Sequence, residues 1–399
     1  MLVNPAVSVA FLVAQIFSWH FWNERLAKGW PRTLLACFYL AVNALAVSVL
    51  INFYWTIEPP PSDPVVWRYF FKPVLLWEMV HFYWVLALAV IFFVSLPFKI
   101  RNRHKAKGLP SLFKNKTTRA RLLCLRGLLL FIMMALAAWG YSQLLEPPLL
   151  YRLKISPNNL PPELNGFTIA VCSDIHYGQG TNQSELNSIF DYIGALNPDI
   201  VILPGDLVDK NPDFALDYQA AISRVKARYG VFAVLGNHDL RTKDAPRLVH
   251  NLRFAGIHVL TDSRTTVPGM PITLIGFTDS GQRGVRATNT QKRFNFDTLS
   301  GPPTNPENLT ILINHRPEAI SEAENNRVDL YLAGHTHGGQ IAAPWDPQLN
   351  LTSLLFGYTY SSGLYNVGDM LVFVSRGVST IIPVRLWTHP EITLLTLTR

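Results

Sequence analysis

The chain has 399 residues, a formal net charge of +8 and a hydrophobic fraction of 49%, which leaves room for a membrane region and one ordinary domain. Residues 1–150 hold 15 Lys and Arg and 5 Asp and Glu, so residues 151–399 hold the remaining 20 of 35 basic and 22 of 27 acidic residues. The second part is therefore not a basic nucleic-acid-binding domain. The three cysteines provide neither a disulfide framework nor a CxxC metal motif.

Four apolar segments near the start of the chain are each long enough to cross a bilayer as a helix, which takes about 20 residues. They are Pro5–Trp22, Thr33–Ile57, Pro73–Phe98 and Leu122–Leu145. Basic residues gather between the first and second segments and between the third and fourth, so the positive-inside rule places both loops in the cytoplasm. An even number of spans then puts both termini, and the part after residue 145, on the outer side.

Residues 146–164 are interpreted as a linker, and residues 165–399 as one α/β domain. Apolar runs predict strands at Phe167–Cys172, Ile200–Leu203, Val231–Leu235, Ile272–Phe277, Leu309–Ile313, Leu330–Leu332, Leu371–Val374 and Ile392–Leu397. Amphipathic patterns predict helices at Ser184–Leu196, Asp213–Ala227 and Asp244–Ala255. Polar clusters then follow several of the strands directly, at the edge where open α/β sheets place their sites.

These polar clusters come in a fixed order along the chain. They are Asp174-Ile175-His176, Gly205-Asp206 with Asp209, Gly236-Asn237-His238-Asp239, Asn314-His315 and Gly334-His335-Thr336-His337-Gly338. On an extended backbone, the two side chains of Asp-x-His or His-x-His point to the same side and can bind one metal ion. A lone Asp-x-His or His-x-His is weak evidence, whereas the whole series predicts a metal centre.

The series DIH, GDLVD, GNHD, NH and GHTHG resembles the calcineurin-like metallophosphoesterase superfamily, over residues 165–398. Later motifs resemble its membrane-associated bacterial branch, which includes enzymes that act on UDP-diacylglucosamine and other lipid-linked substrates. These motifs are Ala333–Gln340, Ser375-Arg376-Gly377, Ile382–Arg385 and Pro390-Glu391-Ile392. The resemblance implies a four-layer αββα sandwich and a bacterial protein. Together with the membrane α-helical anchor and the loop charges, it leads us to expect a location in the bacterial inner membrane with the catalytic domain on the periplasmic or extracellular side.

The resemblance also implies a ligand set for two divalent metal ions. One ion is held by Asp174, His176, Asp206 and His337, and the other by Asn237, His315, His335 and the shared Asp206. A bridging carboxylate keeps two cations within about 4 Å of each other, which suits phosphoryl transfer. Oxygen and imidazole ligands without thiolate favour Mn or Fe, with Zn as the alternative.

Other residues near the motifs are expected to take part in catalysis, to orient the ligands or to contact the substrate. The resemblance makes His238 a catalytic residue that stabilises charge on phosphate or protonates the leaving oxygen. Asp209 and Asp239 are expected to orient histidines from outside the ligand set. Basic residues at Arg283, Arg286, Lys292 and Arg293 are either substrate contacts or a solvated loop. Apolar residues between Gln340 and Tyr365 suit either contact with lipid or packing against the sheet.

The sequence therefore predicts a membrane-anchored phosphoesterase that hydrolyses a phosphodiester or pyrophosphate bond by metal-activated hydrolysis. Membrane lipid or a lipid-linked phosphoester is the expected partner, because a soluble substrate does not require so much hydrophobic chain, and nucleic acid is not expected. A tethered phosphodiesterase for soluble or nucleotide substrates remains an alternative, as do a transporter with an accessory hydrolase and a non-catalytic membrane scaffold. Oligomeric state and ester preference stay open.

Overall fold

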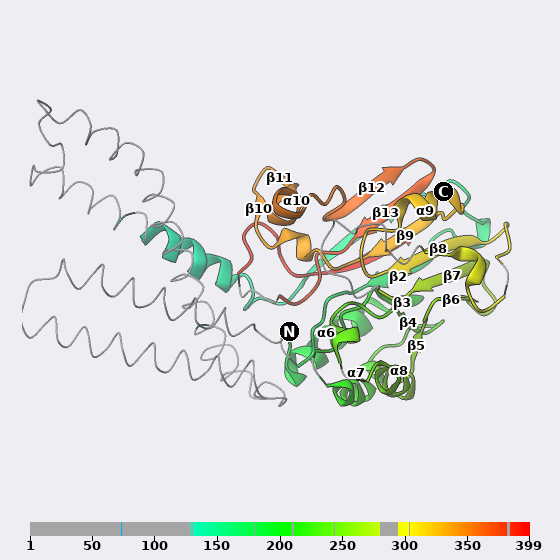
Figure 1. Ribbon diagram of the computed structural model, residues 1–399, viewed down its shortest axis with the longest axis horizontal. Helices are drawn as coiled ribbons and strands as arrows, with labels where there is room; N and C mark the ends of the chain where they lie inside the picture. Colours follow the sequence, from blue (N-terminus) through cyan, green and yellow to red (C-terminus); the bar gives the residue numbers. More distant parts are fainter. Residues whose placement is uncertain are drawn as a thin grey trace, which may run out of the picture. The chain divides into compact units, whose positions relative to one another are not determined.

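The computed structural model describes residues 131–178, 180–209, 211–242, 244–279, 294–302, 304–380 and 384–399, together with Pro73 and Leu128. The chain divides into two compact units, one formed by residues 1–56 and 68–142 and the other by residues 57–67 and 143–399. Figure 1 shows the described residues in colour, among them the two sheets of the second unit and their helices.

In the first unit, residues 131–142 are helical and lie inside the fourth predicted span. Phe131 is 69% exposed and Trp139 40% exposed, so this helix presents large apolar side chains on its surface. Among the residues that the structure describes, no helix is both long enough and apolar enough to cross a bilayer. The first three predicted spans and residues 122–130 of the fourth lie outside the described residues, apart from Pro73 and Leu128.

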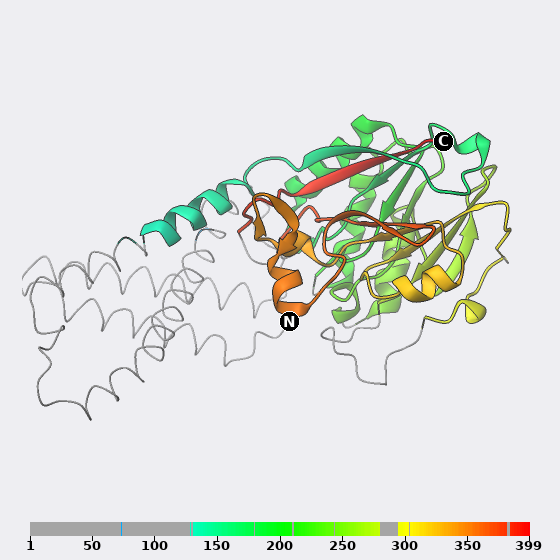
Figure 2. The ribbon, with the colours of Figure 1, turned by 90° about the horizontal axis from the view of Figure 1, so that it is seen from above.

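The first sheet of the second unit has six strands in the order β1-β14-β2-β3-β4-β5. Its strands are β1 (Leu149–Ile155), β2 (Thr168–Val171), β3 (Ile200–Leu203), β4 (Val231–Ala233), β5 (Ile257–Val259) and β14 (Glu391–Leu397). Strands β2 to β5 are parallel, β14 is antiparallel to β2, and β1 is parallel to β14. Figure 2 shows β1 in teal beside β14 in red.

The second sheet also has six strands, in the order β12-β13-β9-β8-β7-β6. They are β6 (Ser263–Thr266), β7 (Ile272–Phe277), β8 (Leu309–Asn314), β9 (Leu330–Ala333), β12 (Gly363–Val367) and β13 (Met370–Val374). The four central strands are parallel, and the edge strands β6 and β12 are antiparallel to their neighbours. Every residue of β7, β8 and β9 is buried, as expected for parallel strands that are covered on both faces.

Three hydrophobic clusters define the layers. One lies between the sheets and joins Ile169 and Ile202 of the first to Ile311 and Leu332 of the second. Another packs α6 (Gln183–Leu196), α7 (Tyr218–Ile222) and α8 (Ala245–Phe254) on the outer face of the first sheet. The remaining cluster packs α9 (Ile320–Asn325) on the outer face of the second. The arrangement is a mixed α/β sandwich with helix, sheet, sheet and helix in succession.

The remaining elements are short. Single 3-10 turns are η2 (Pro162–Leu164), η3 (Pro212–Asp217), η4 (Asp239–Arg241), η5 (Phe296–Thr298) and η6 (His337–Gly339). Beyond η6 come β10 (Ala342–Ala343), β11 (Asp346–Asn350) and α10 (Leu351–Phe356). Asn350 starts α10 with a capping box, and Gly357 ends it in a left-handed conformation, which is the usual chemistry of helix ends.

Two parts of the fold differ from the sequence-based expectation. The expected linker 146–164 contains β1, because its backbone pairs with β14 along its whole length although its outer side chains are exposed. The expected helix Asp213–Ala227 is instead η3 followed by the short α7. Pro212 and the Asn211 side chain, which accepts from the backbone N–H of Asp213, start the tighter turn.

Candidate metal centre

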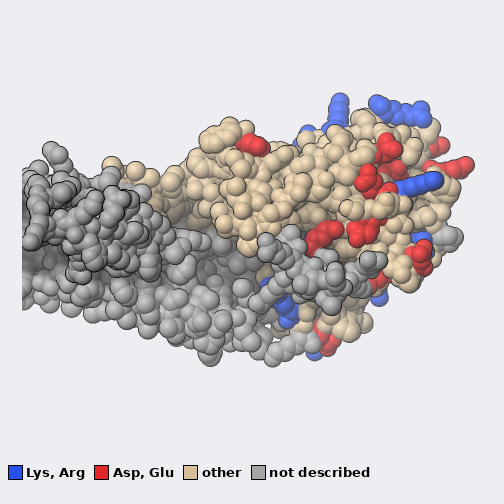
Figure 3. Space-filling model, turned by 45° about the horizontal axis from the view of Figure 1, so that its top comes forward, with Lys and Arg blue, Asp and Glu red and all other residues tan. Residues whose placement is uncertain are grey.

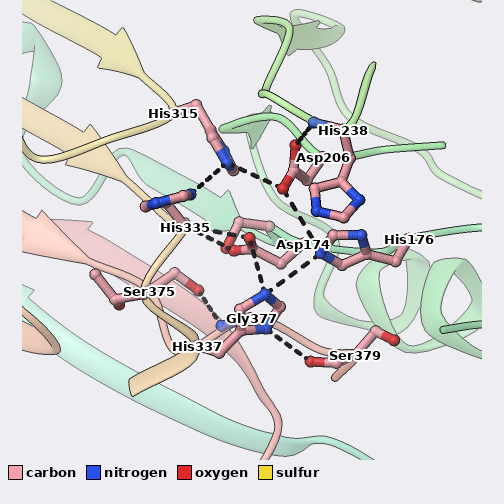
Figure 4. A network of polar contacts seen from close by, with 12 residues as sticks. Asp174, His176, Asp206, His238, His315, His335, His337, Ser375, Gly377 and Ser379 are labelled. Carbon is pink, nitrogen blue, oxygen red and sulfur yellow. Dashed lines mark hydrogen bonds and ion pairs between the residues drawn. The ribbon is translucent and has the colours of Figure 1, made fainter. Parts of the chain in front are cut away.

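The polar clusters predicted from sequence come together at one edge of the sandwich. Asp174 and His176 follow β2, Asp206 follows β3, His315 follows β8, and His335 and His337 follow β9. Figure 4 shows these side chains pointing into one common space. The loops are joined through their backbones, because Asp174 N–H donates to Gly205 O over 3.1 Å and His176 N–H donates to Asp206 O over 2.9 Å.

The backbone at these residues is left-handed and not extended. The φ angles are 56° at Asp174, 50° at His176, 52° at Asp206, 72° at His335 and 51° at His337. Such conformations cost roughly 1–2 kcal/mol each for residues with a Cβ, and they persist only where surrounding contacts enforce them. The expectation of extended Asp-x-His and His-x-His segments is therefore wrong, although their side chains still converge because each turn is left-handed at both positions.

One group of side chains consists of Asp174, His176 and His337. The two histidine Nε2 atoms are 3.3 Å apart, and His337 Nε2 lies 3.6 Å from Asp174 Oδ1. All three side chains are buried. Three ligand atoms at such spacing surround a position that suits one cation.

A neighbouring group consists of Asp206, His315 and His335. His315 Nε2 lies 3.1 Å from Asp206 Oδ2, and His335 Nδ1 lies 3.2 Å from His315 Nε2. Asp206 Oδ2 is also 3.6 Å from His176 Nε2 of the first group. The same carboxylate oxygen therefore faces both groups, which is the placement that a bridging ligand requires.

Hydrogen bonds at the opposite ring nitrogen orient three of the histidines. His176 Nδ1 lies 3.2 Å from Asp209 Oδ2, His315 Nδ1 donates to Pro204 O over 2.8 Å, and His337 Nδ1 donates to Ser379 O over 3.0 Å. An acceptor at Nδ1 keeps the proton on that nitrogen, so the lone pair at Nε2 faces the centre. This arrangement is the one that metal-binding histidines commonly adopt.

The residues present fit two divalent cations. Asn237 Oδ1 is buried and has no hydrogen-bond partner within the part of the chain that the structure describes. A buried acceptor without a partner is costly, and a cation beside Asp206 would satisfy it. The carboxylates of Asp174, Asp206 and Asp209 are buried together as well, and such a concentration of negative charge is stable only when it is compensated.

The pKa values of the histidines reflect this negative charge. Burial alone would lower the pKa of His176, but the carboxylates of Asp209, Asp206 and Asp174 outweigh it and raise the pKa to about 9. At His315, burial is likewise outweighed, chiefly by Asp206, and the pKa rises to about 10. Burial instead lowers the pKa of His337 to about 4, with His176 and Arg385 adding to the decrease. The imidazoles nearest the carboxylates thus attract positive charge, as a cation site does.

His238 lies beside this centre and is buried. Its backbone N–H donates to Asp206 Oδ1 over 2.7 Å, and its Nδ1 lies 2.5 Å from Asp209 Oδ1. Its Nε2 is 2.8 Å from Arg241 Nη1. Asp209 therefore uses one oxygen for His176 and the other for His238, so a single carboxylate positions both rings, as the sequence predicted for this residue.

Asp239 does not orient a histidine, which corrects the sequence-based expectation. Its Oδ1 accepts from the backbone N–H groups of Leu207 and Val208, and its Oδ2 accepts from that of Gly236. The carboxylate therefore ties the loop after β3 to the loop after β4. The physical reason is that Asp239 begins η4 and is fully buried under both turns.

Glycine is required where these loops approach each other. A Cβ at Gly334 would lie 2.5 Å from Asp174 Oδ2, and a Cβ at Gly236 would lie 2.3 Å from Asp206 Oδ1. Both distances are far below normal contact, so the glycines allow carboxylate groups to sit directly against the backbone of a neighbouring turn.

Comparison with known proteins identifies this arrangement. The profile of the calcineurin-like phosphoesterase family matches residues 167–339, which include all the loops of the centre. Residues 167–339 therefore form a calcineurin-like phosphoesterase domain. The two groups of His and Asp side chains lie within this domain and are its candidate place for divalent metal ions.

Relatives of this chain come from animals and bacteria. It is 32% identical to a zebrafish protein named transmembrane protein with metallophosphoesterase domain, over 68% of this chain and 62% of that protein. It is 28% identical to the uncharacterized metallophosphoesterase YkuE of Bacillus subtilis, over 65% of this chain and 89% of the relative. Identity to the phosphodiesterase YaeI of Escherichia coli is 27%, over 65% and 93%. The chain thus spans less than two thirds of the zebrafish protein.

The structure does not describe the predicted basic residues, and several participants at the site were missed by the sequence analysis. Arg283, Arg286 and Arg293 fall outside the described residues, as does Lys292. The acceptors Pro204 O and Ser379 O were missed because a backbone carbonyl leaves no signal in the residue type. Arg385 was missed too, although it is fully buried and its Nη2 donates to Ser379 O over 2.8 Å. Its place in the motif Ile382–Arg385 was the available signal.

Proposed function

We propose that this chain is a membrane-anchored enzyme that uses two divalent metal ions to hydrolyse a phosphodiester or pyrophosphate bond in a lipid-linked substrate. The supporting observation is the convergence of two groups of ligands on Asp206, with Asn237 Oδ1 buried beside them and without a partner in the described part of the chain. No covalent intermediate with the protein is required, because two cations suffice to activate water and to neutralise phosphate.

The proposed ligand sets follow the two groups. Asp174, His176, Asp206 and His337 hold one ion, whereas Asp206, Asn237, His315 and His335 hold the other. When bound, the ions act as Lewis acids that polarise the phosphoryl group and favour attack by water. Oxygen and nitrogen ligands without sulfur support Mn or Fe, with Zn as the alternative.

The protein's own catalytic group in this proposal is His238. His238 Nδ1–H donates to Asp209, which fixes the orientation of the ring, so Nε2 is the nitrogen left to act on the substrate. When Nε2 is protonated, in place of the hydrogen bond that it accepts from Arg241, it donates that proton to the leaving oxygen. Arg241 lies against this nitrogen, and a guanidinium there adds positive charge where the phosphate and leaving oxygen accumulate negative charge. Asp209 is a positioning residue, because its two oxygens face rings and not the substrate.

The lipid-linked substrate is supported by the first part of the chain. The fourth predicted span ends at Leu145 and β1 begins at Leu149, so only a short connection separates a membrane surface from the catalytic domain. The zebrafish relative is named a transmembrane protein. Loop charges favour a catalytic domain on the outer side of the membrane.

Dilution of the substrate within the surface of mixed micelles tests whether the substrate is linked to lipid. Purified full-length protein with added Mn²⁺ is assayed in mixed micelles on extracted lipid phosphodiesters and pyrophosphates, and in parallel on soluble bis(p-nitrophenyl) phosphate. We expect the rate on lipid substrates to fall as the substrate is diluted within the micelle surface at constant bulk concentration. Turnover of only the soluble ester, with no dependence on the surface concentration of lipid, would instead support a tethered phosphodiesterase for soluble substrates.

A further inference from the structure

Large apolar side chains are exposed along the segment that follows the metal-binding turn His335-Thr336-His337. The exposed fractions are 79% at Trp345, 67% at Leu354, 65% at Leu355, 59% at Phe356, 41% at Leu349 and 37% at Ile341. We call these six residues, which belong to or adjoin β10, β11 and α10, the apolar lip. Single exposed apolar residues are ordinary, but a contiguous group of this kind marks a contact surface.

The apolar lip carries almost no charge. In the sequence from Gly338 to Asn366, Asp346 is the only Asp, Glu, Lys or Arg. Figure 3 shows the end of the domain that holds β10, β11 and α10 in Figure 1 as tan with one acidic spot, whereas the basic and acidic side chains gather toward the other end. A surface of Trp, Phe and Leu without basic residues suits the hydrophobic part of a bilayer interface and not an electrostatic partner.

Hydrogen bonds join the apolar lip to the metal centre. Thr336, which stands between the two histidines, donates through Oγ1 to Ser361 O over 2.6 Å and accepts at its carbonyl from Thr352 Oγ1 over 3.3 Å. Thr352 lies in α10, and Ser361 also accepts a side-chain bond from Asn350, the residue that caps α10. Whatever the apolar lip contacts is therefore held next to the turn that carries His335 and His337.

Tyr358 provides a further contact between the end of α10 and the surroundings of His335. It follows the end of α10 at Gly357, and its centroid lies 6.1 Å from that of His335. The Tyr358 hydroxyl lies 3.5 Å from Glu318 Oε1, and Glu318 lies 3.6 Å from Arg316, the neighbour of His315. Tyr358 thus joins the end of α10 to polar groups that neighbour His315 and His335.

We propose that the apolar lip inserts into the interfacial region of the bilayer that holds the chain's own predicted spans. Since four residue steps separate Leu145 from Leu149, and each adds at most about 3.6 Å, the domain begins within about 14 Å of that surface. The proposal rests on the proposed membrane location and not on the identity of the substrate. Because the apolar lip lacks cations, insertion is equal on zwitterionic and anionic lipids.

A fluorescent label tests the insertion directly. Leu355→Cys is introduced into the full-length chain with Cys37→Ser and Cys124→Ser, labelled with nitrobenzoxadiazole and reconstituted into phosphatidylcholine vesicles. Cys172 is left in place, because it is buried and burial raises the pKa of its thiol, which keeps it unreactive. Phe254→Cys is the matched control, since Phe254 in α8 is 63% exposed against 65% for Leu355 but lies in a different layer.

We expect the label at position 355 to shift to shorter emission wavelength and to be quenched several-fold by lipids brominated on their acyl chains, and the label at position 254 to do neither. The same quenching is expected when half the phosphatidylcholine is replaced by phosphatidylglycerol. A label at 355 that stays in water overturns the proposal. So does a label that shifts in wavelength without quenching, because a protein surface, such as a second copy of the chain, would then cover the apolar lip.

Activity provides a separate test. The double variant Leu354→Asp with Leu355→Asp is expected to lose tenfold or more in the hydrolysis of lipid-linked phosphoesters in vesicles, while hydrolysis of bis(p-nitrophenyl) phosphate stays unchanged. Leu354→Met with Leu355→Met, which keeps the apolar character, is expected to retain both activities. If the unaltered protein hydrolyses no lipid substrate, the proposed function fails, while brominated-lipid quenching still decides the insertion. Quenching without any difference between the aspartate and methionine variants would overturn the link between insertion and substrate access.

Discussion

The metal centre and the apolar lip are adjacent in the chain but are built in opposite ways. Around the metal centre the side chains of Asp174, Asp206 and His315 are buried, and the backbone takes left-handed conformations that only dense contacts maintain. In the apolar lip, Trp345 and Leu354 are largely exposed. Hydrolysis of a phosphoester therefore needs ligands whose positions are fixed, whereas contact with a fluid lipid surface needs only exposed apolar area.

The link between the two regions is Thr336. It belongs to the metal-binding turn by sequence and to the surroundings of α10 by its hydrogen bonds. A change within the rigid region should therefore reduce all activity, while a change in the exposed region should affect only substrates that are embedded in lipid.

Among the changes that leave the proposed metal ligands intact, removal of the imidazole at position 238 is expected to have the largest effect. His238→Ala should lower kcat by about 10²–10⁴-fold, the usual contribution of general acid catalysis, on lipid and soluble substrates alike. Metal content should stay at the level of the unaltered protein. His238 also lies within ligand distance of His176 and Asp206, so a loss of bound metal in the variant would show that it is a ligand and not the acid.

The next largest loss of activity is expected when an added Cβ crowds the metal centre. Gly334→Ala places a Cβ 2.5 Å from Asp174 Oδ2 and 2.7 Å from Ser173 Oγ, and a displacement of about 1 Å in a catalytic group costs about 10²-fold in rate. Steady-state kinetics on the soluble ester measure the effect. Gly194→Ala is the control, because its Cβ would lie 2.4 Å from Arg224 O, away from the centre. Equal kinetic losses in both variants would contradict a specific role for the close approach at Gly334.

A smaller effect is expected from Arg385. Its guanidinium donates to the carbonyls of Arg376, Gly377 and Ser379, and Ser379 O also orients His337. Arg385→Lys keeps the charge but cannot reach all three carbonyls, so metal affinity should fall by about 10–100-fold, as with other groups that orient ligands. Titration with Mn²⁺ measures it, and Arg247→Lys, at an exposed ion pair with Asp213, should match the unaltered protein. An unchanged affinity in Arg385→Lys would contradict its positioning role.

The smallest effect is expected from a single charge beside the apolar lip. Asp346→Lys replaces the acidic neighbour of Trp345 by a cation, which is worth about 1 kcal/mol near an anionic membrane surface. Hydrolysis of lipid substrates should become several-fold faster on vesicles with phosphatidylglycerol than on phosphatidylcholine, and this preference should disappear in high salt. Asp297→Lys, exposed in η5, should show no preference. A preference in both variants would mean that the whole domain surface, and not the apolar lip, senses lipid charge.

Sequence patterns predicted the buried strands and the convergence of the polar clusters. Strands β3 and β7 begin and end at the predicted residues, because a continuous apolar run between polar turns has few other structures available. The proposed ligand residues lie together because each follows such a strand, and parallel strands end at the same edge. The match to the calcineurin-like family confirms the superfamily that these motifs indicated.

Features that depend on distant parts of the chain were not predictable. Strand β1 carries Arg152 and Lys154 and resembles a linker, and it becomes a strand only because β14, near the end of the chain, pairs with it. The left-handed backbone at Asp174 and His335 likewise depends on neighbouring loops. The apolar segment after Gln340 left lipid contact and core packing equally open, since only the structure shows that Trp345 and Leu355 are exposed.

Asp206 is proposed to join two metal ions in one centre, and counting the metal ions bound per chain tests this bridging role. Full-length protein, Asp206→Asn and the exposed control Asp191→Asn are loaded with Mn²⁺, desalted and measured for metal per chain and for hydrolysis of bis(p-nitrophenyl) phosphate. We predict two ions per chain with full activity in the unaltered protein and the control, and loss of at least one ion together with all hydrolysis in Asp206→Asn. Two ions and full hydrolysis in Asp206→Asn would contradict the account.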